Sequence, residues 1–445
     1  MFWAIKISKS DPTPLYIQLA NELIRLIDSG MLPAKTKLPT IRTLSSKLKI
    51  NRDTVVNAYR LLESKNYVIA HIGSGTYVAP QIAPAPLESK LSPIACSRAV
   101  FPRELFSINI CQNLLSKVLE DEGWEAFSDP LQRERQLIRQ SISNYLKSVG
   151  VCASPTKTRL IKDSSQLILE LLKLSPKSTI CVEAYRDLNY TTTLRNLGFK
   201  IIEVPMTPDG MDLNILEHHL KSSNVAYILA TPYIQNPTGV CYSEEKKATL
   251  IDLCTNYDCY LIEDGTFSDF AYNTTKLTPC YHIKDNDRVI YLYHFCKIYL
   301  PHLDYTFAVL PTDLQKRLVD NLQCTLNERL LHYYLQSQDF EDIRQNIILS
   351  TQQKYLVLHN FFIENKDAFE IYAHDGGLFF WIKPLHLSTK KITQLFLAHN
   401  IIVSPADLFT TQLGVNYFRL SIASLSEEQI NILIDVLIQT KKVSL

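Results

Sequence analysis

Glycine is scarce in this chain, at 12 of 445 residues, whereas globular proteins average about 7%. The chain has 10 cysteines, but no two have the Cys-x-x-Cys spacing of zinc sites and redox motifs. No uncharged apolar run reaches the roughly 18 residues that a membrane helix needs, and the first residues lack the apolar stretch of a signal peptide. We therefore expect no metal site, no membrane span and no secretion signal, but a cytoplasmic protein with reduced thiols.

Positive charge is concentrated at the start of the chain. Residues 1–80 contain 11 Lys and Arg against 5 Asp and Glu, a net of +6, and the remaining residues contain 35 against 40, a net of −5. A basic end on an otherwise ordinary body is typical of a segment that binds a polyanion. The length of 445 residues exceeds the usual size of one domain and favours two or three.

Residue spacing predicts three helices and a hairpin in the basic segment. Apolar residues recur at helical spacing over 17–27 and stop before Ser29-Gly30, and a second, short helix is predicted over 39–48. Asn51 is placed to cap a third helix, and residues 67–78 predict a β-hairpin with a glycine tip. Two short helices joined by about three residues form a helix-turn-helix unit, whose second helix can enter the major groove of DNA.

Residues 13–80 resemble the GntR class of bacterial winged-helix regulators. The matching stretches, in order and with the family's gaps, are Pro14-Leu15-Tyr16, Leu38-Pro39-Thr40-Ile41-Arg42, Asn51-Arg52-Asp53-Thr54-Val55-Val56 and Gly73-Ser74-Gly75-Thr76-Tyr77-Val78. The resemblance implies that the segment binds double-stranded DNA. The residues expected to contact it are Arg42, Asn51, Arg52, Thr54, Asn57, Gly73, Ser74 and Gly75.

The residue types of this set suit the expected contacts. Arg42 and Arg52 supply guanidinium forks for phosphates or guanine edges, and the glycines let backbone N–H groups approach a phosphate. Two alternatives stay open at this point. Arg42 could instead pair with a carboxylate on a helix, and for Asn51 we favour a helix cap over a base contact.

The rest of the chain predicts an α/β domain. Prolines without strong periodicity over 81–100 indicate a semi-extended linker. Apolar runs spaced widely enough for crossover helices then predict a mostly parallel sheet, with strands at 179–182, 201–204, 225–230, 259–263, 289–293 and 306–310. From about residue 315 a helical stretch leads into a smaller α+β subdomain. The expected domains are therefore 1–80, a linker over 81–100, and 101–445.

Residues 100–440 resemble the fold-type I, class I aminotransferases. The most recognisable stretch is Ala230-Thr-Pro-Tyr-Ile-Gln-Asn-Pro-Thr-Gly239, followed by Leu261-Ile-Glu-Asp264 and by Lys297 in Tyr-His-Phe-Cys-Lys-Ile-Tyr. A GntR-class head, a proline-bearing linker and this domain in one chain look like a MocR-type transcriptional regulator. That family implies an aminotransferase-derived sensor that binds pyridoxal 5′-phosphate (PLP) and a small amino-compound effector, and that works as a homodimer.

The same resemblance assigns roles to individual residues. Lys297 would hold PLP as a Schiff base, Asp264 would pair with the pyridinium nitrogen, and Asn236 would donate to the ring 3′-oxygen. Arg419 would clamp an effector carboxylate through a bidentate pair. Each residue also has an ordinary alternative, since Lys297 could face solvent, Asp264 could cap a helix and Arg419 could form a structural ion pair.

The sequence departs from the aminotransferase pattern where the cofactor phosphate and ring should be held. Asp304 stands where the family has a phosphate-binding arginine, so that a like charge replaces an attraction. His294 and Cys296 replace small hydroxyl residues, and His294 could substitute only if protonated. Thr266 replaces a tyrosine. Asp187 replaces the ring-stacking aromatic, unless Tyr185 or Tyr190 takes over.

The phosphate-binding turn is also altered. It consists here of Lys162-Asp-Ser-Ser-Gln166, in which Ser164 and Ser165 remain useful donors but the glycine that admits the backbone is gone. We therefore expect a weakened phosphate anchor and no efficient transamination, although residual PLP chemistry at Lys297 stays open.

Three hypotheses follow from the sequence. The first is a transcription factor whose aminotransferase-like domain senses PLP or an amino-compound effector. The second keeps the regulator but makes the large domain a cofactor-free dimerisation scaffold. The third is an active PLP-dependent aminotransferase with a DNA-binding head.

Overall fold

The computed structural model describes residues 13–28, 32, 36–64, 67–71, 75–79, 93–102, 105–128, 132–162, 164–272, 278–283, 287–300, 305–318, 322 and 324–444. The chain divides into two compact units, Met1–Ser92 and Pro93–Leu445. Within the described residues, no helix is both long and apolar enough to cross a bilayer.

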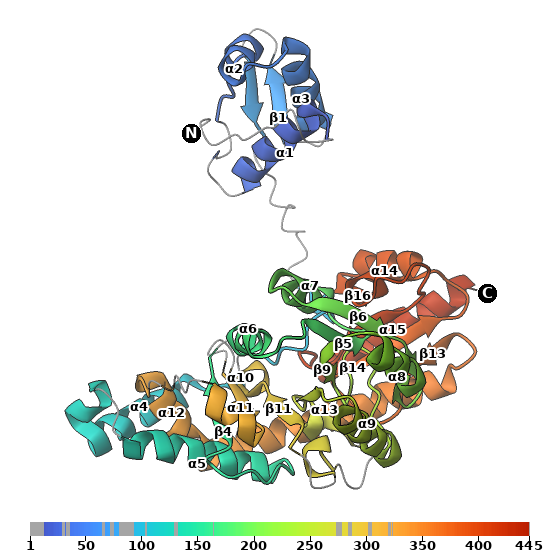
Figure 1. Ribbon diagram of the computed structural model, residues 1–445. Helices are drawn as coiled ribbons and strands as arrows, with labels where there is room; N and C mark the ends of the chain where they lie inside the picture. The colour runs from blue at the N-terminus through green and yellow to red at the C-terminus, as the bar shows by residue number, and fades with distance from the viewer. Residues whose placement is uncertain are drawn as a thin grey trace. The chain divides into compact units, whose positions relative to one another are not determined.

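The first unit is a three-helix winged domain. Helices α1 (Leu15–Asp28), α2 (Ile41–Leu48) and α3 (Arg52–Ser64) precede an antiparallel hairpin of β1 (Val68–His71) and β2 (Gly75–Val78) (Figure 1). The predicted helix-turn-helix and hairpin are thus confirmed.

Local chemistry sets the bounds of the short helix α2. The hydroxyl of Thr40 accepts a hydrogen bond from the Thr43 backbone N–H and caps the helix start. The helix ends at Lys49, which has a left-handed φ of 53° and donates its backbone N–H to the Ser45 carbonyl. The turn into α3 is then closed by Ser45, whose hydroxyl donates to the carbonyl of Ile50.

Packing holds the three helices and the hairpin together. Leu23 of α1, Leu44 of α2 and Val55 of α3 are fully buried in one cluster with Val68 and Val78 of the hairpin. Burying a side chain of this size stabilises a fold by about 1.5–3 kcal/mol. The helical periodicity of the basic segment therefore reflects a shared core.

The second unit is built on a seven-stranded sheet with the order β4-β12-β11-β10-β9-β5-β6. Neighbours from β11 to β6 run parallel, and β12 is antiparallel to both of its neighbours. All six predicted strands are present, and β4 is the strand that the sequence did not predict. The strands are β4 (Thr158–Ile161), β5 (Thr179–Glu183), β6 (Lys200–Val204), β9 (Val225–Ala230), β10 (Tyr260–Asp264), β11 (Val289–Tyr293) and β12 (Thr306–Val309).

Helices connect and cover these strands. In Figure 1, α4, α5 and α12 pack together at one end of this unit, and α14 and α15 lie at the other. The α-helices are α4 (Ile108–Glu122), α5 (Gln132–Ser148), α6 (Ser164–Leu174), α7 (Leu188–Asn196), α8 (Leu213–Ser222), α9 (Glu244–Asn256), α10 (Phe295–Ile298), α11 (Thr312–Arg317), α12 (Leu326–Leu335), α13 (Gln338–Glu364), α14 (Thr389–Ala398) and α15 (Glu427–Ser444). The 3-10 turns are η3 (Gly123–Phe127), η4 (Ser268–Phe270), η5 (Cys280–His282) and η6 (Ala406–Leu408).

A smaller antiparallel sheet forms the carboxy-terminal subdomain, as expected. Its order is β13-β14-β17-β16, and α13, α14 and α15 accompany it. The strands are β13 (Phe369–Ile371), β14 (Phe379–Pro384), β16 (Ser404–Pro405) and β17 (Phe418–Ser421). Two further pairs are short: β7 (Met206–Thr207) with β8 (Gly210–Met211), and β3 (Ile94–Ala95) with β15 (Ile401–Ile402).

The last pair corrects the expected linker. Residues 93–100 belong to the second unit, because Ile94 pairs in parallel with Ile401 and its backbone N–H donates to the Asn400 carbonyl at 2.9 Å. The linker predicted over 81–100 is therefore too long at its carboxyl end. Residues 80–92 lie outside the described residues.

Candidate DNA-binding surface and candidate cofactor site

The start of α3 carries the expected DNA-contacting side chains. Arg52 and Asn57 are exposed and Thr54 is half-buried. Asn51 accepts the backbone N–H of Asp53 at 3.2 Å, so it caps the helix as we favoured. Arg42 is exposed on α2, and no carboxylate among the described residues pairs with it. Both arginines are therefore accessible to an external anion.

The wing, formed by the hairpin of β1 and β2, pairs with a segment that contains a basic residue. This residue is not among the DNA contacts predicted from the sequence. The Leu38 N–H donates to Thr76 O at 2.8 Å, and the Val78 N–H donates to Thr36 O at 2.9 Å, so residues 36–38 extend the hairpin. The exposed Lys37 lies there with its Nζ 5.6 Å from the centre of the Tyr77 ring. Gly73 and Ser74 lie outside the described residues.

The backbone conformation of Gly75 favours glycine at the start of β2. Its φ is +119°, which L residues rarely adopt, and a Cβ there would lie 2.9 Å from Cε of Lys37. The Lys37 side chain could move away from such a Cβ, so the positive φ is the feature that favours glycine. Gly75 is one of the residues that the sequence predicts to contact DNA.

The second unit brings together the residues predicted to hold a cofactor. Asp264 ends β10, Asn236 follows β9, and Lys297 lies in α10 just after β11. These three strands are parallel neighbours, so their carboxyl ends meet at one edge of the sheet, where open α/β proteins bind ligands. The predicted residues are thus placed on one side of the fold.

Asp264 is held by Thr266, the residue that replaces the expected tyrosine. Oδ1 of Asp264 accepts the backbone N–H of Thr266 at 3.0 Å and its hydroxyl at 2.5 Å. Burial raises the pKa of Asp264, but the charge of His294, the Thr266 bonds and the charge of Arg186 together outweigh it, so the net pKa lies below the ordinary value. Asp264 is therefore ionised at neutral pH.

His294 lies between two threonine hydroxyl groups beside Asp264. Its Nδ1 lies 2.8 Å from Oγ1 of Thr306, and its backbone N–H donates to Oγ1 of Thr266. Burial lowers its pKa, helped by Lys297 and Arg186 and opposed by Asp264. The net pKa of His294 lies below its ordinary value, and the expected phosphate contact of this residue stays a prediction.

Asn236 and Arg419 contact each other across the two subdomains of this unit. Nη1 of Arg419 donates to Oδ1 of Asn236 at 2.8 Å. Because arginine can only donate, the amide NH₂ of Asn236 is the group left to donate elsewhere. Arg419 is buried, and its guanidinium lies 4.7 Å from the centre of the Phe409 ring.

The electrostatics of Arg419 and Lys297 differ from those of surface cations. Burial lowers the pKa of Arg419 to about 10, and the charge of Asp187 opposes the shift. The Lys297 side chain is exposed to solvent, but protein surrounds it closely enough for desolvation to lower its pKa. Asp264 opposes that shift and Arg419 adds to it. A lysine of this kind is a better nucleophile near neutral pH.

Arg186 is a charged residue that the sequence did not single out. It is buried, and its Nη2 donates to Oε2 of Glu183 at 3.0 Å and to Oγ1 of Thr231 at 2.8 Å. Burial opposes its charge, but Glu183 and Asp264 more than offset this, so its pKa is raised. A permanent cation therefore lies near Asp264. A local signal was present in the sequence, because Glu183 and Arg186 are charged residues at and just after the end of the apolar strand β5.

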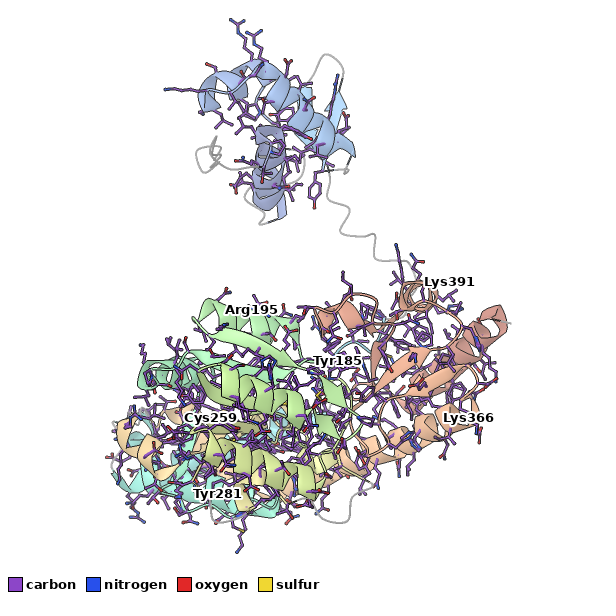
Figure 2. All side chains as sticks on the ribbon, turned by 45° about the vertical axis from the view of Figure 1, so that its right-hand side comes forward. Tyr185, Arg195, Cys259, Tyr281, Lys366 and Lys391 are labelled. Carbon is purple, nitrogen blue, oxygen red and sulfur yellow. The ribbon has the colours of Figure 1, made fainter. Side chains whose placement is uncertain are left out.

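Asp187, which stands at the position expected for the ring-stacking aromatic, caps a helix. Asp187 is exposed and caps α7, with Oδ1 accepting the Asn189 N–H at 2.9 Å. The ring of Tyr190 lies under Arg186, with 5.8 Å between the guanidinium carbon and the ring centre. Tyr185, which is labelled in Figure 2, contacts Tyr372 and Trp381 of the small subdomain instead.

The phosphate end of the site lies largely outside what the structure describes. This applies to Asp304 and to the side chains of Cys296, Ser164 and Ser165, although the two serines do begin α6. Lys162 is described, and it pairs with the buried Glu328 at 2.8 Å.

Comparison with known proteins finds a matching family for each of the two units. Residues 15–78 match the family described as bacterial regulatory proteins, gntR family, and residues 161–300 match aminotransferase class I and II. The HTH-type pyridoxine biosynthesis transcriptional regulator PdxR of Corynebacterium glutamicum is 27% identical over 341 residues, which is 73% of this chain and 72% of that protein. The probable rhizopine catabolism regulatory protein MocR of Rhizobium meliloti is 25% identical over 342 residues, 69% of this chain and 68% of that protein.

A solved structure supports the fold of the second unit. The multiple substrate aminotransferase from Thermococcus profundus covers 80% of this chain and 93% of its own, with a TM-score of 0.69 and 22% identity. The chain is therefore a DNA-binding transcriptional regulator built on an aminotransferase fold. The two family matches in one chain, together with these relatives, support a MocR-type regulator, as the sequence motifs predicted.

The described residues fit the aldehyde and ring of PLP, the cofactor of this fold. PLP presents an electrophilic aldehyde, a pyridine nitrogen, a ring oxygen and a phosphate. Lys297 supplies an amine, Asp264 an ionised carboxylate, and Asn236 an amide NH₂ whose partner oxygen is fixed by Arg419. The three groups converge on one edge of the sheet and match the first three needs of the cofactor.

The electrostatics of the site give a prediction for Lys297. Competitive acylation by acetic anhydride over a pH series should give Lys297 a midpoint below about 10.4, the usual value for lysine. Asp264 raises the pKa of Lys297, so Asp264→Asn should lower the midpoint further. The exposed Lys391 of α14, labelled in Figure 2, serves as the reference amine. A Lys297 midpoint at or above the usual value, or an upward shift in Asp264→Asn, would contradict the assignment.

Proposed function

We propose that the head binds duplex DNA through α3, α2 and the wing. The exposed side chains of Arg42, Arg52 and Asn57 and the wing lysine Lys37 support this assignment. Helix α3 is the second helix of the helix-turn-helix and is the one to enter the major groove. Arg42 and Lys37, which both precede α3 in the chain, suit phosphate contacts that fix the register of this helix on DNA.

We propose further that the second unit responds to PLP or a PLP-related amino compound. The observation that carries this proposal is the Lys297 amine, whose pKa is lowered, beside an ionised Asp264 and the Asn236–Arg419 pair. When bound, PLP supplies an aldehyde that a lysine amine traps and a ring that withdraws electrons. A relative whose name refers to pyridoxine biosynthesis supports the same class of ligand.

Sensing fits the site better than efficient transamination. Arg186 already stabilises the charge on Asp264, so that carboxylate depends less on a pyridinium partner. The position of the stacking ring is occupied by a helix cap, Asp187. Both features weaken the electronic control of the cofactor that catalysis needs, while they leave a lysine able to trap an aldehyde. A ligand shifts the regulator between states only as far as its affinities for the two states differ.

PLP binding is tested by spectroscopy. Added PLP should give the full-length protein a red-shifted absorbance band, and borohydride reduction should fix the adduct on Lys297, as read by peptide mapping. Lys297→Ala should lose both signals, whereas Lys366→Ala, an exposed lysine just after α13, should keep them (Figure 2). No band in the wild type would favour the cofactor-free scaffold, and turnover of an amino acid by half-transamination would favour the enzyme.

The DNA assignment is tested by salt dependence. Each phosphate contact steepens the fall of log K with log salt by about 0.9. If Lys37 and Arg42 contact phosphates, the change of either to Ala should reduce the slope on a fixed duplex by roughly that amount. Lys391→Ala, which lies in the other unit, should leave the slope unchanged. An equal slope in all variants would remove these residues from the interface.

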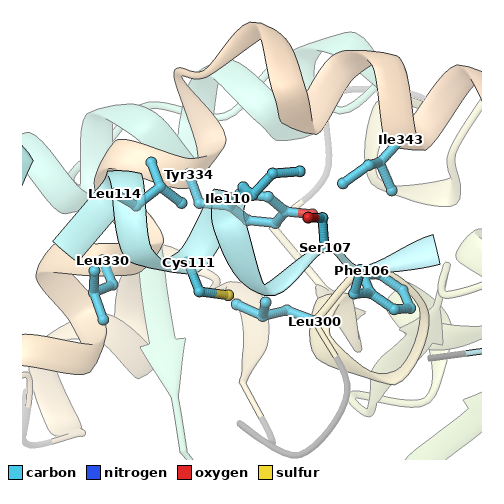
Figure 3. Close-up of a pocket in the computed structure, with 9 residues that line it drawn as sticks. All are labelled: Phe106, Ser107, Ile110, Cys111, Leu114, Leu300, Leu330, Tyr334 and Ile343. Carbon is cyan, nitrogen blue, oxygen red and sulfur yellow. The ribbon is translucent and has the colours of Figure 1, made fainter. Parts of the chain in front are cut away.

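We propose that the regulator is a homodimer that associates through the α4 face. This face, defined by Ile108, Leu115, Leu119, Trp124 and Phe127 of α4 and η3, exposes 68%, 36%, 40%, 87% and 63% of those side chains. Such apolar exposure on two adjoining elements is typical of an interface. An apolar groove with a volume of about 90 Å³ lies beside this face. Figure 3 shows residues that line it, among them Ile110 and Leu114 of α4 and Leu330 and Tyr334 of α12.

Sedimentation velocity tests the homodimer. Ile108→Asp combined with Trp124→Asp should shift the protein from dimer to monomer at micromolar concentration, because each change would place a charge in an apolar contact. Leu397→Asp on α14 alters a side chain of similar exposure, 63%, and should leave the dimer intact. A variant of the α4 face that sediments like this control would contradict the proposal.

A further inference from the structure

Two buried cysteines lie where helix α9 ends and strand β10 begins. Cys254 is in the last turn of α9, and Cys259, which is labelled in Figure 2, directly precedes β10. Both side chains are 0% exposed, and they belong to one core cluster that also contains Cys181 and Cys280. The fold therefore gathers four buried thiols in one cluster, although no two of them have Cys-x-x-Cys spacing.

The end of α9 explains why Cys254 and Cys259 meet. Asp258 has a left-handed φ of 49°, and the Cys259 N–H donates to the Cys254 carbonyl at 3.1 Å. A left-handed residue followed by such a bond is characteristic of the Schellman motif, in which the side chains of the two bonded residues commonly make contact. Two cysteines can be joined only when their backbones are already close. The sequence has a cysteine at each of the two positions that this turn brings together.

The two sulfurs differ in their protonation. The sulfur of Cys259 accepts a hydrogen bond from the Cys254 thiol, which lowers the pKa of Cys259 and raises that of Cys254. Burial and the charge of Asp258 oppose the shift of Cys259, whereas the charges of Lys177 and Arg288 favour it. The Asp258 carbonyl accepts Nζ of Lys177 at 2.8 Å, and its carboxylate pairs with Nη1 of Arg288 at 2.7 Å. Because the thiolate is the reactive form of cysteine, Cys259 is the better nucleophile of the two.

The two neighbouring thiols lack such an environment. Burial raises the pKa of Cys181 to about 12, and the charge of Cys259 adds to the shift. Burial also raises the pKa of Cys280 well above its ordinary value, helped by the charge of Glu263. Cys181 lies within β5 and Cys280 in η5, so no helix end pairs either of them with another cysteine. They are therefore suitable references for the pair at the end of α9.

We propose that Cys254 and Cys259 form a reversible disulfide when the protein meets a hydroperoxide. The Cys259 thiolate attacks the peroxide, the O–O bond breaks, and uptake of one proton leaves a sulfenic acid on Cys259 and one molecule of water or alcohol. The Cys254 thiol then attacks the sulfenic sulfur and gives up its proton, so that the S–S bond forms and the hydroxyl leaves as water. The two thiols lose two electrons in all, and the peroxide gains them.

Burial determines which oxidants can reach the pair. Because both sulfurs are buried, the end of α9 must open locally before Cys259 reacts. Thr255, Asn256 and Asp258 are exposed, so only a short segment at the surface has to move. A small hydroperoxide should therefore react in the folded protein, and a bulky aromatic disulfide reagent should react far more slowly. The new bond would cross-link the start of the strand that ends at Asp264 of the candidate cofactor site.

Peptide mapping of the full-length protein tests the disulfide. The reduced protein is treated with hydrogen peroxide, and the remaining thiols are then alkylated in denaturant. In the wild type, the peptide that contains Cys254 and Cys259 should lose the mass of two hydrogen atoms, and dithiothreitol should restore it. Cleavage after Tyr257, which lies between the two cysteines, should leave the fragments joined.

Single variants assign the roles of the two thiols. Cys254→Ala should leave Cys259 as a sulfenic acid that dimedone traps, and Cys259→Ala should leave Cys254 unoxidised. Cys280→Ala, the matched control from the same cluster, should keep the disulfide. Lys177→Gln should slow its formation, because the change removes a cation that lowers the pKa of Cys259.

The wild-type map needs no substitution, so it is decisive even where a variant fails to fold. Peroxide that oxidises the exposed Cys152 but leaves Cys254 and Cys259 reduced would overturn the proposal. A bond from either residue to Cys181 or Cys280 would also overturn it, as would a dimedone adduct of Cys259 in the wild type without any disulfide. Neither PLP nor DNA takes part in these measurements.

Discussion

The carboxylate of Glu183 is the constraint on which the site depends. It is 1% exposed and lies at the end of β5. A charge in such a place is tolerated only when it is paired and hydrogen-bonded. Glu183 accepts bonds from Arg186, from the Thr231 N–H, from Gln235 and from the Tyr242 hydroxyl, at 3.0, 3.0, 3.2 and 2.7 Å.

These bonds tie the end of β5 to the loop after β9. Gln235 precedes Asn236, and its amide also donates to the Tyr185 carbonyl while its oxygen accepts from Thr238. The Asn236 amide is therefore held by a network that begins at Glu183 and ends at Arg419. The same carboxylate places the guanidinium of Arg186 near Asp264. The charges around Lys297 thus follow from one buried acid.

Much of this molecule could be predicted from its sequence. Five of the six predicted strands lie in apolar runs because most of their residues are buried within the sheet, whereas the edge strand β6 is mostly half-buried. The helices of the DNA-binding unit could be predicted from the helical spacing of their apolar residues. Strand β4 was missed because its four residues alternate between buried and half-buried. Residues 93–100 were predicted to be part of the linker because Ile94 pairs with Ile401, which is far along the chain. No local sequence pattern indicates such a pairing.

Some residues of the candidate site could likewise be predicted from the sequence, and others could not. Lys297, Asp264, Asn236 and Arg419 were found because they stand in motifs. Thr266 was noted only as a missing tyrosine, although its hydroxyl holds Asp264. Arg186, and Ser97, whose carbonyl accepts a bond from Arg419, were not considered. Their roles arise from contacts between distant segments, which a single sequence does not display. Asp187 shows the reverse, because its helix cap is local and could have been predicted.

The central claim is that a ligand at Lys297 alters DNA binding by the head. Its most direct test is the affinity of the full-length protein for a duplex that it selects from a random pool, measured by fluorescence anisotropy with and without PLP. Coupling of the usual size would change the Kd about 5- to 150-fold in the wild type and leave Lys297→Ala unchanged. The same Kd with and without PLP in the wild type, or the same change in Lys297→Ala, would contradict the account.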